Sequence, residues 1–483
     1  MKKILSFFTR NNDTALAMPY EGVVRFVPLV ICGGFFFVTI LLHAFGPTDW
    51  GIQNPFALYS FLFLCLFALI GGYLLATFKG KTGEGKVNLN AGNILTVGAV
   101  VFLLLFFPLC RLTTGKWFPD VYFGITNTGA AYRLTKYYSD IAPNFLFYLR
   151  IALSPVLFVV MPITFFFFPK LSKVQKALGI STIALNVALG IAQGVNKHVA
   201  DLCMQLILVL IILLFCGGKK TKKERLIYCA KILALILVIC ALFVLYYWNS
   251  MNNRVATDIQ LAESGEISEE KLEENLSKKP RVDTEKLNAT MGSYATFSTG
   301  KDRNWAFWNA VLPGKLKPAA NFLISYFCHG YNGLSYAMEE EFTSSYGLGF
   351  SDFIRHNAMR FFGGTEAEEN IYARTYMAKI EEQGWQTGPV WSSFFIFPAS
   401  DISFPGTILL VFIIGYLFGL SWKDTLCTQN PFACAVFLGF STMVFYFSAN
   451  NQMFQGGENC TAFCALLLLW ILSRIFTQRE KNV

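Results

Sequence analysis

The chain has 483 residues, of which 54% are hydrophobic and only 15% are charged. Soluble globular proteins carry about 25% charged residues, so this composition excludes an ordinary soluble domain. Apolar runs of about 18 residues or more recur along the chain, a pattern typical of polytopic α-helical membrane proteins. The net charge of +9 is less informative than the positions of Lys and Arg, because those positions set orientation in a membrane.

Ten apolar segments are expected to cross the membrane. In chain order they cover residues 23–45, 55–78, 94–110, 145–168, 177–195, 199–216, 226–248, 402–420, 432–448 and 460–476. The predicted fold class is therefore an all-α polytopic membrane protein. Residues 1–248 would form the first seven transmembrane helices, 249–401 a large helical loop domain, and 402–483 the last three helices with a C-terminal tail.

Basic residues cluster in alternate connections between the predicted spans. Three such loops lie at Lys79–Lys86, Lys170–Lys176 and Lys219–Arg225, and the C-terminal tail is also basic. Because positively charged loops stay in the cytoplasm, both termini are predicted to be cytoplasmic. The segment 249–401 is then predicted to be extracytoplasmic.

Several cations depart from this rule and remain on the predicted outer side. Arg133 lies between the third and fourth spans, and Arg150 lies just inside the fourth. Snorkelling at the interface could explain Arg150. Cations kept outside could also bind an anion, and phosphate suits a guanidinium because two parallel hydrogen bonds can form.

The short turn from Gln193 to Asp201 has the sequence QGVNKHVAD between two apolar segments. Lys197, His198 and Asp201 therefore lie at the end of a hairpin with almost no loop. Ionisable groups are costly there unless they face a water-filled cavity, so the cluster indicates a site. Lys197 alone could be explained by snorkelling.

The long polar segment changes character along its length. A short solvated helix is predicted after Ser268, and an interfacial helix around Trp305–Leu312. Residues 326–406 are rich in Tyr, Trp, Phe and Gly, with His and Arg between them, which suits a domain that binds a polar ligand. The stretch Tyr326–Met338 contains His329, Asn332 and glycines, so we expect an interfacial or re-entrant helix and not an eleventh span.

Three pieces of sequence resemble the O-antigen polymerase family, the oligosaccharide repeat-unit polymerases of bacterial surface glycans. They are Gly-x-Asn-Lys-His at Gly194–His198, the run HGYNGLSYAM…YGLGFSDF, and WSSFFIFPASDISFPG followed by IIGYLFG. The resemblance covers about residues 90–450, and the topology of about ten helices with one large outer loop agrees. Many members of the family carry Arg in the short turn where this chain has Lys197.

The resemblance implies a glycosyltransferase of the bacterial inner membrane that acts on polyprenyl-diphosphate-linked oligosaccharides. It would polymerise repeat units at the outer leaflet, with lipid-linked donor and acceptor, membrane lipids and a chain-length regulator as partners. No nucleic acid, cofactor or metal is expected. The predicted diphosphate-binding residues are Arg133, Arg150, Lys197, His198, Arg360 and Arg374.

Sugar binding is predicted for Tyr326, Tyr331, Asn332 and Trp391. His329 is the preferred base or acceptor-positioning residue, since it lies among these side chains and His is the usual base near neutral pH. Glu340, from a run of three glutamates, is the rival.

Two other functions remain open. An O-antigen ligase would share the architecture and the donor but use a different acceptor. A lipid-linked-oligosaccharide flippase or transporter would show repeated halves and broken helices around a midplane site. The sequence shows no internal repeat, which favours the polymerase.

Overall fold

The computed structural model describes residues 20, 22–81, 89–137, 145–216, 222–252, 268, 301–303, 305–311, 324, 326–385 and 391–479. Within these ranges, nine helices are long and apolar enough to cross a membrane. One further apolar helix, α22 (Pro431–Phe445), has only 15 residues. Each of the ten predicted spans thus corresponds to an apolar helix, and the chain is an all-α multi-pass membrane protein.

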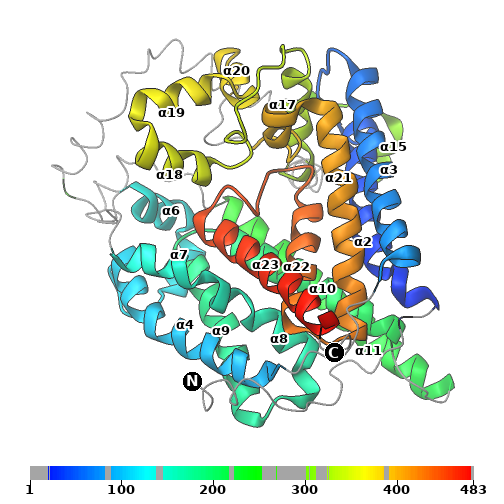
Figure 1. Cartoon of the computed structure of the whole chain (residues 1–483), viewed down its shortest axis with the longest axis vertical. Coiled ribbons are helices and arrows are strands. Elements are labelled where there is room, and N and C mark those ends of the chain that lie inside the picture. The colour runs from blue at the N-terminus through cyan, green and yellow to red at the C-terminus, as the bar shows by residue number, and fades with distance from the viewer. Residues whose placement is uncertain are drawn as a thin grey trace.

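The long helices form one bundle (Figure 1). They are α2 (Val27–Phe45), α3 (Pro55–Lys79), α4 (Ala91–Thr114), α7 (Phe145–Phe158) continued by α8 (Val160–Phe167), α9 (Lys173–Ala192), α10 (Lys197–Cys216), α11 (Lys222–Asn252), α21 (Ile396–Cys427) and α23 (Gly457–Arg479).

Shorter elements connect and cover this bundle. They are η1 (Gly22–Phe26), α5 (Val121–Thr126), α6 (Thr128–Tyr137), η2 (Phe168–Lys170), α15 (Ala306–Val311), α17 (Gly330–Ala337), α18 (Asp352–Phe362), α19 (Gly364–Ala373) and α20 (Tyr376–Glu382). Two-residue strands, β1 (Thr48–Asp49) and β2 (Lys301–Asp302), pair antiparallel.

Polar caps begin several of the apolar helices. The Asn54 side chain accepts the N–H of Ala57 at 3.1 Å, and Pro55 follows it as the first helical residue of α3. Asn430 and Pro431 repeat this arrangement at the start of α22. A cap satisfies an N–H group that the helix leaves free, and proline costs nothing at this position. The residues at the helix start therefore determine where α3 and α22 begin.

Small residues bring α3 and α21 into close contact, and the two helices lie side by side in Figure 1. A Cβ atom on Gly72 would lie 2.0 Å from the carbonyl oxygen of Phe412, and one on Gly415 would lie 2.3 Å from that of Leu69. Backbones approach this closely only where side chains are absent, as in the small-residue interfaces of membrane helices. The IIGYLFG segment, which includes Gly415, is thus a helix-packing motif.

We expect Gly415→Leu to destabilise the protein by about 1–3 kcal/mol, because the new side chain must push α3 away from α21. Unfolding by SDS in mixed micelles would measure the loss. Gly34→Leu on α2 is the control, since a Cβ there meets nothing within 4 Å. Equal stability of the two variants would contradict the packing role of Gly415.

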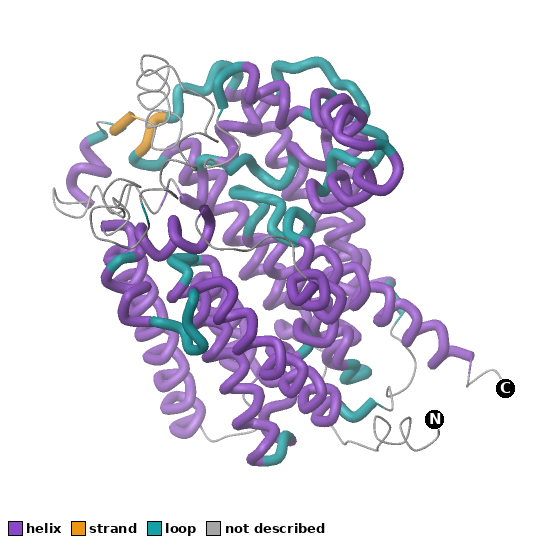
Figure 2. The backbone as a smooth tube through the Cα atoms, turned by 90° about the vertical axis from the view of Figure 1, so that its left-hand side faces the viewer, coloured by secondary structure: helices purple, strands orange, loops and turns teal. Residues whose placement is uncertain are grey.

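Residues 326–385 and 391–400, here called the cap, lie at one end of the bundle. Figure 2 shows the short helices and loops of the cap above the long helices. α17 has eight residues, too few to cross a membrane, as predicted. The helix predicted after Ser268 falls mainly outside the described residues.

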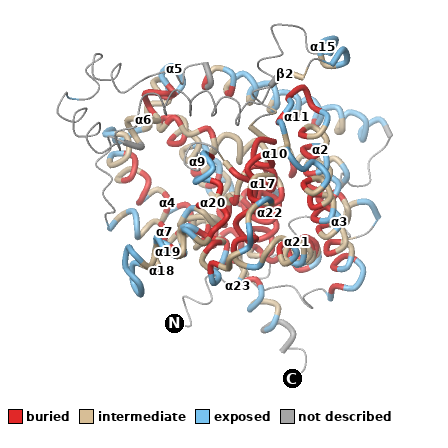
Figure 3. Tube along the Cα trace, turned by 90° about the horizontal axis from the view of Figure 1, so that it is seen from above, coloured by how far each residue is buried: buried red, intermediate tan, exposed pale blue. Residues whose placement is uncertain are grey.

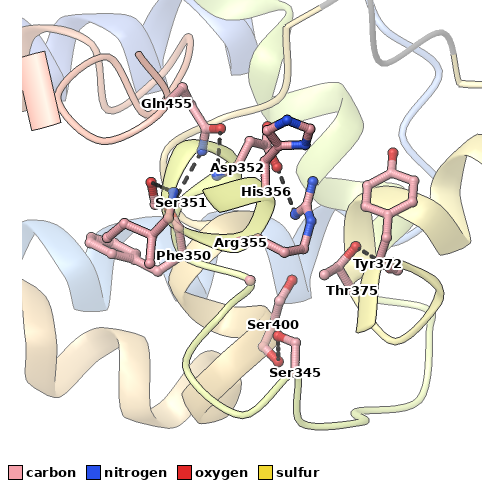
Figure 4. A network of polar contacts seen from close by, with 12 residues as sticks. Ser345, Phe350, Ser351, Asp352, Arg355, His356, Tyr372, Thr375, Ser400 and Gln455 are labelled. Atoms are coloured by element: carbon pink, nitrogen blue, oxygen red, sulfur yellow. Dashed lines mark hydrogen bonds and ion pairs between the residues drawn. The ribbon is translucent and has the colours of Figure 1, made fainter. Parts of the chain in front are cut away.

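Asp401 joins the cap to α21. Its carboxylate accepts the hydroxyl of Ser345 at 2.6 Å and the backbone N–H groups of Gly347, Gly349 and Phe350 at 2.9, 3.0 and 2.8 Å. Beside it, Ser345 also donates to the carbonyl of Ser400 (Figure 4). Hydrogen bonds to an ionised carboxylate are among the stronger ones. The 345–350 loop is therefore fixed to the start of α21.

Two predicted spans are interrupted or bent in the structure. The fourth is divided into α7 and α8 near Val159, a stretch with prolines at Pro155 and Pro162 that interrupt backbone hydrogen bonding. α21 begins at Ile396, six residues before the predicted Ile402, but is kinked at Ser403, where φ is +65°. The predicted boundary thus falls at the kink and not at the start of the helix.

Candidate functional site

A cavity of about 180 Å³ lies inside the bundle, between α4, α7, α8, α9, α10, α22 and α23. Its ionisable lining residues are Arg150, Lys197, His198, Asp201 and Glu458. Arg150, Lys197 and Glu458 all lie near the starts of their helices. Ionisable groups are rare inside membrane bundles and mark functional sites by default. The cavity is therefore the candidate site.

One ion pair on the cavity wall joins α7 to α23. The Nε of Arg150 lies 2.9 Å from Oε2 of Glu458, and both side chains are partly exposed to the cavity. Glu458 is also in the first turn of α23, where the helix dipole favours a negative charge. Since only Nε meets Glu458, the two Nη groups find no acceptor in the described part of the chain. They can still bind an anion.

A second ion pair lies within α10. Nζ of Lys197 is 2.5 Å from Oδ2 of Asp201, and the hydroxyl of Tyr446 donates to Oδ1 of the same carboxylate at 2.8 Å. Both carboxylate oxygens of Asp201 are thus occupied. Asp201 therefore holds Lys197 in place.

Three buried polar atoms of lining residues lack a hydrogen-bond partner among the described residues. They are Oγ1 of Thr182, Nδ1 of His198 and Oε1 of Gln205. Buried polar groups are nearly always satisfied, by protein or by ordered water. All three belong to side chains that contribute to the wall of the cavity.

A non-helical segment borders the cavity between α22 and α23. Residues 446–456 are irregular, yet Ser448, Asn451 and Met453 are buried, and Met453 lines the cavity. The cap supports this segment through the N–H of Phe394, which donates to the carbonyl of Phe447 at 3.0 Å. Irregular backbone inside a membrane protein is tolerated where protein buries it or a water-filled cavity adjoins it.

The structure brings together three residues predicted to bind diphosphate: Arg150, Lys197 and His198. Sequence reasoning missed Glu458 as a site residue. The signal was present, because Glu458 is an acidic residue at the start of the last apolar segment.

The other three predicted diphosphate ligands are not among the residues that line the cavity. Arg133 lies on α6 and is partly buried. Arg360, on α18, donates to the hydroxyl of Tyr148 at 2.8 Å. Arg374 donates to the carbonyl of Ser344 at 2.7 Å. Arg360 therefore connects the cap to α7, and Arg374 connects α19 to the loop that contains Ser344.

His329 lies in an aromatic cluster with Tyr326 and Trp391. Its Nε2 accepts the backbone N–H of Trp391 at 3.2 Å, and the rings of Tyr326 and Trp391 are 4.9 Å apart. An imidazole nitrogen that already accepts a hydrogen bond is a poor base for a substrate hydroxyl. This geometry suits the positioning role that was predicted for His329 beside the role of base.

Tyr331, Asn332 and Glu340 occupy structural environments. Tyr331 is fully buried and its hydroxyl is 2.9 Å from that of Thr39; burial raises the pKa of Tyr331 well above its usual value. Asn332 is also buried, and the carboxylate of Glu340 accepts the side-chain amide of Gln383. The first two therefore present no open face to a sugar, and Glu340 is hydrogen-bonded to Gln383 at the end of α20.

Comparison with known proteins identifies no relative: no protein-family model, curated protein or solved structure matches the chain. The resemblance to the O-antigen polymerases therefore depends on the three quoted motifs alone.

Proposed function

We propose that the protein polymerises oligosaccharide repeat units carried on polyprenyl diphosphate, by glycosyl transfer at the outer leaflet of a bacterial cytoplasmic membrane. The cavity carries this proposal, because it gathers Arg150, Lys197 and His198 from two helices beside a carboxylate, Glu458. Cationic side chains would stabilise the diphosphate as it leaves.

The proposed reaction forms one bond and breaks one bond. The acceptor hydroxyl oxygen attacks the anomeric carbon of the donor glycan, and the bond from that carbon to the diphosphate oxygen breaks. The electron pair leaves with the diphosphate, whose charge Arg150 and Lys197 stabilise. Glu458 accepts the hydroxyl proton at Oε1, which has no partner among the described residues, while Oε2 remains with Arg150.

The direct test uses purified protein in proteoliposomes with a synthetic polyprenyl-diphosphate oligosaccharide. We expect a ladder of products that differ by one repeat unit, visible by mass spectrometry after release from the lipid. Products formed only when a different acceptor is supplied would identify a ligase. The absence of any new glycosidic bond with either acceptor would refute the proposed glycosyl transfer.

A transporter of lipid-linked oligosaccharides is the second candidate. The buried irregular segment 446–456 next to an ionic cavity favours it, because transporters often place broken helices around their binding site. Passage of a fluorescent lipid-linked oligosaccharide across the proteoliposome bilayer, without elongation, would support this function.

The proposed orientation places the cap outside the cell and the opposite end of the bundle in the cytoplasm. A cysteine at exposed Tyr346, in the cap, should react with a membrane-impermeant maleimide in intact cells. A cysteine at Lys81, which follows the far end of α3, should react only after permeabilisation. Each is compared with the parent chain, which has native cysteines. Labelling of the cysteine at position 81 but not of that at 346 in intact cells would show that the orientation is the opposite one.

The proposed reaction needs no metal, because Arg150 and Lys197 supply the positive charge that faces the diphosphate. Treatment of the purified protein with EDTA should leave polymerisation unchanged. Activity that EDTA abolishes and Mg²⁺ or Mn²⁺ restores would contradict this expectation. The chelator 1,10-phenanthroline, which has higher affinity for Zn²⁺, serves as a second control.

A further inference from the structure

One helix of the cap carries an apolar stripe that the described part of the protein leaves exposed. α18 presents Ile354, Ala358, Phe361 and Phe362 at positions i, i+4, i+7 and i+8, the spacing of one helix face. Phe361 is 78% exposed and Phe362 is 89% exposed. Exposing two adjacent phenylalanine side chains to water is unfavourable, and exposed apolar patches of this kind often mark interaction sites.

The opposite side of α18 is held by polar and ionic contacts. Arg355 is buried, lies 2.7 Å from Asp352, and stacks over the ring of Tyr372 on α19 at 4.8 Å (Figure 4). His356 lies 3.1 Å from Glu368, also on α19. The contacts of Arg355 and His356 with α19 fix the rotation of the helix, so the apolar stripe is a stable feature of its surface.

Contacts with the bundle set the height of α18 relative to the membrane. Arg360 donates to the hydroxyl of Tyr148, in the first turns of α7. Phe145, Phe147 and Tyr148 are exposed aromatic residues at that end of α7. Aromatic belts of this kind mark the boundary between the hydrocarbon core and the lipid headgroups. An interfacial position of these aromatic residues would place the C-terminal end of α18, with Phe361 and Phe362, at the level of the headgroups.

α18 also lies beside the proposed active site. A Cβ atom on Gly457, the residue before Glu458, would lie 2.6 Å from the ring of Phe353 and 3.0 Å from Ile151, the residue after Arg150. α18 thus packs over the starts of α7 and α23, which hold the Arg150–Glu458 pair. Seen from above, it lies exposed at the edge of the molecule (Figure 3).

We propose that α18 is a membrane-interface helix, with Ile354, Phe361 and Phe362 inserted among the lipids beside the cavity. The partner is the bilayer itself: acyl chains contact the stripe, and headgroup phosphates lie within reach of the exposed side chain of Arg360. Burial of apolar area together with attraction between cations and phosphates is the usual basis of such binding. This inference concerns the position of the cap relative to the membrane and does not depend on the proposed reaction.

Photo-crosslinking in the full-length protein tests this proposal and leaves the native cysteines in place. The photoreactive residue p-benzoylphenylalanine is placed at position 361, 362 or 354, and the protein is irradiated in lipid vesicles. We expect covalent lipid adducts at all three positions, detected by mass spectrometry. Tyr346 is the matched control, because it is an aromatic cap residue that is 68% exposed, and no lipid adduct is expected there.

Three results would overturn the inference. Adducts absent from positions 361 and 362, or equally abundant at 346, would show that the stripe does not face lipid. Crosslinks between two protein chains at 362, in place of lipid adducts, would identify a second copy as the occupant. None of these readouts requires glycosyl transfer, so loss of the proposed activity would leave the inference standing.

Discussion

Replacing Arg150 by alanine should slow repeat-unit polymerisation by about a hundredfold or more. Loss of one charge-assisted contact to a developing anion in a water-poor site costs about 2–4 kcal/mol of transition-state stabilisation. The variant also leaves Glu458 without its cationic partner in the cavity wall. The measurement is the initial rate of ladder formation in proteoliposomes, with the amount of inserted protein checked for each variant.

Lys116→Ala is the matched control for Arg150→Ala. Lys116 also lies beyond the third span and also pairs with a carboxylate, Asp120, but its side chain is 62% exposed. Such surface pairs contribute little, so the rate should stay close to that of the parent protein. Arg150→Lys separates charge from geometry, because lysine keeps the charge but not the planar fork. A normal rate for Arg150→Ala would show that this arginine does not stabilise the transition state.

Asp424→Ala should lower the free energy of unfolding by about 3–5 kcal/mol, the usual cost of removing one partner from a buried ion pair. Asp424 is 1% exposed, and its Oδ2 accepts Nη1 of Arg474 at 2.8 Å and Nε1 of Trp470 at 2.9 Å. The variant leaves the guanidinium of Arg474 without its carboxylate. SDS unfolding in mixed micelles would measure the change.

Two further variants sharpen this prediction. Asp424→Ala combined with Arg474→Met should recover part of the stability, because the unpaired charge is then absent. Glu369→Ala, at an exposed position on α19, should unfold like the parent protein. Stability of Asp424→Ala equal to that of Glu369→Ala would show that the pair contributes nothing.

The sequence predicted the membrane helices well because their signal is local. Apolar length and the caps at Asn54 and Asn430 are both read from neighbouring residues. The bend at Ser403 was not predicted, although Pro405 and Gly406 follow it closely and a proline interrupts helical hydrogen bonding. α22 was likewise expected to extend to Ser448, whereas the helix ends at Phe445 and the chain continues as a buried irregular segment.

The candidate site was predictable in part. Lys197 and His198 are adjacent in a conspicuous turn, and Arg150 breaks the charge pattern of the outer side. Glu458 joins them only because α7 packs against α23, a contact between residues separated by 308 positions. In contrast, the aromatic composition around Tyr331 suggested ligand binding but reflects burial against α2. Composition alone does not distinguish a sugar-binding surface from a core.

The attachment of the cap through Asp401 has a consequence for the order of events during synthesis. The loop that Asp401 holds ends at Phe350, and its bonding partners precede Asp401 by 51 to 56 residues. When the loop emerges from the ribosome, the carboxylate that organises it has not yet been translated. The cap can therefore acquire its final arrangement only after α21 has begun to enter the membrane, so closure of the cap is late in biogenesis.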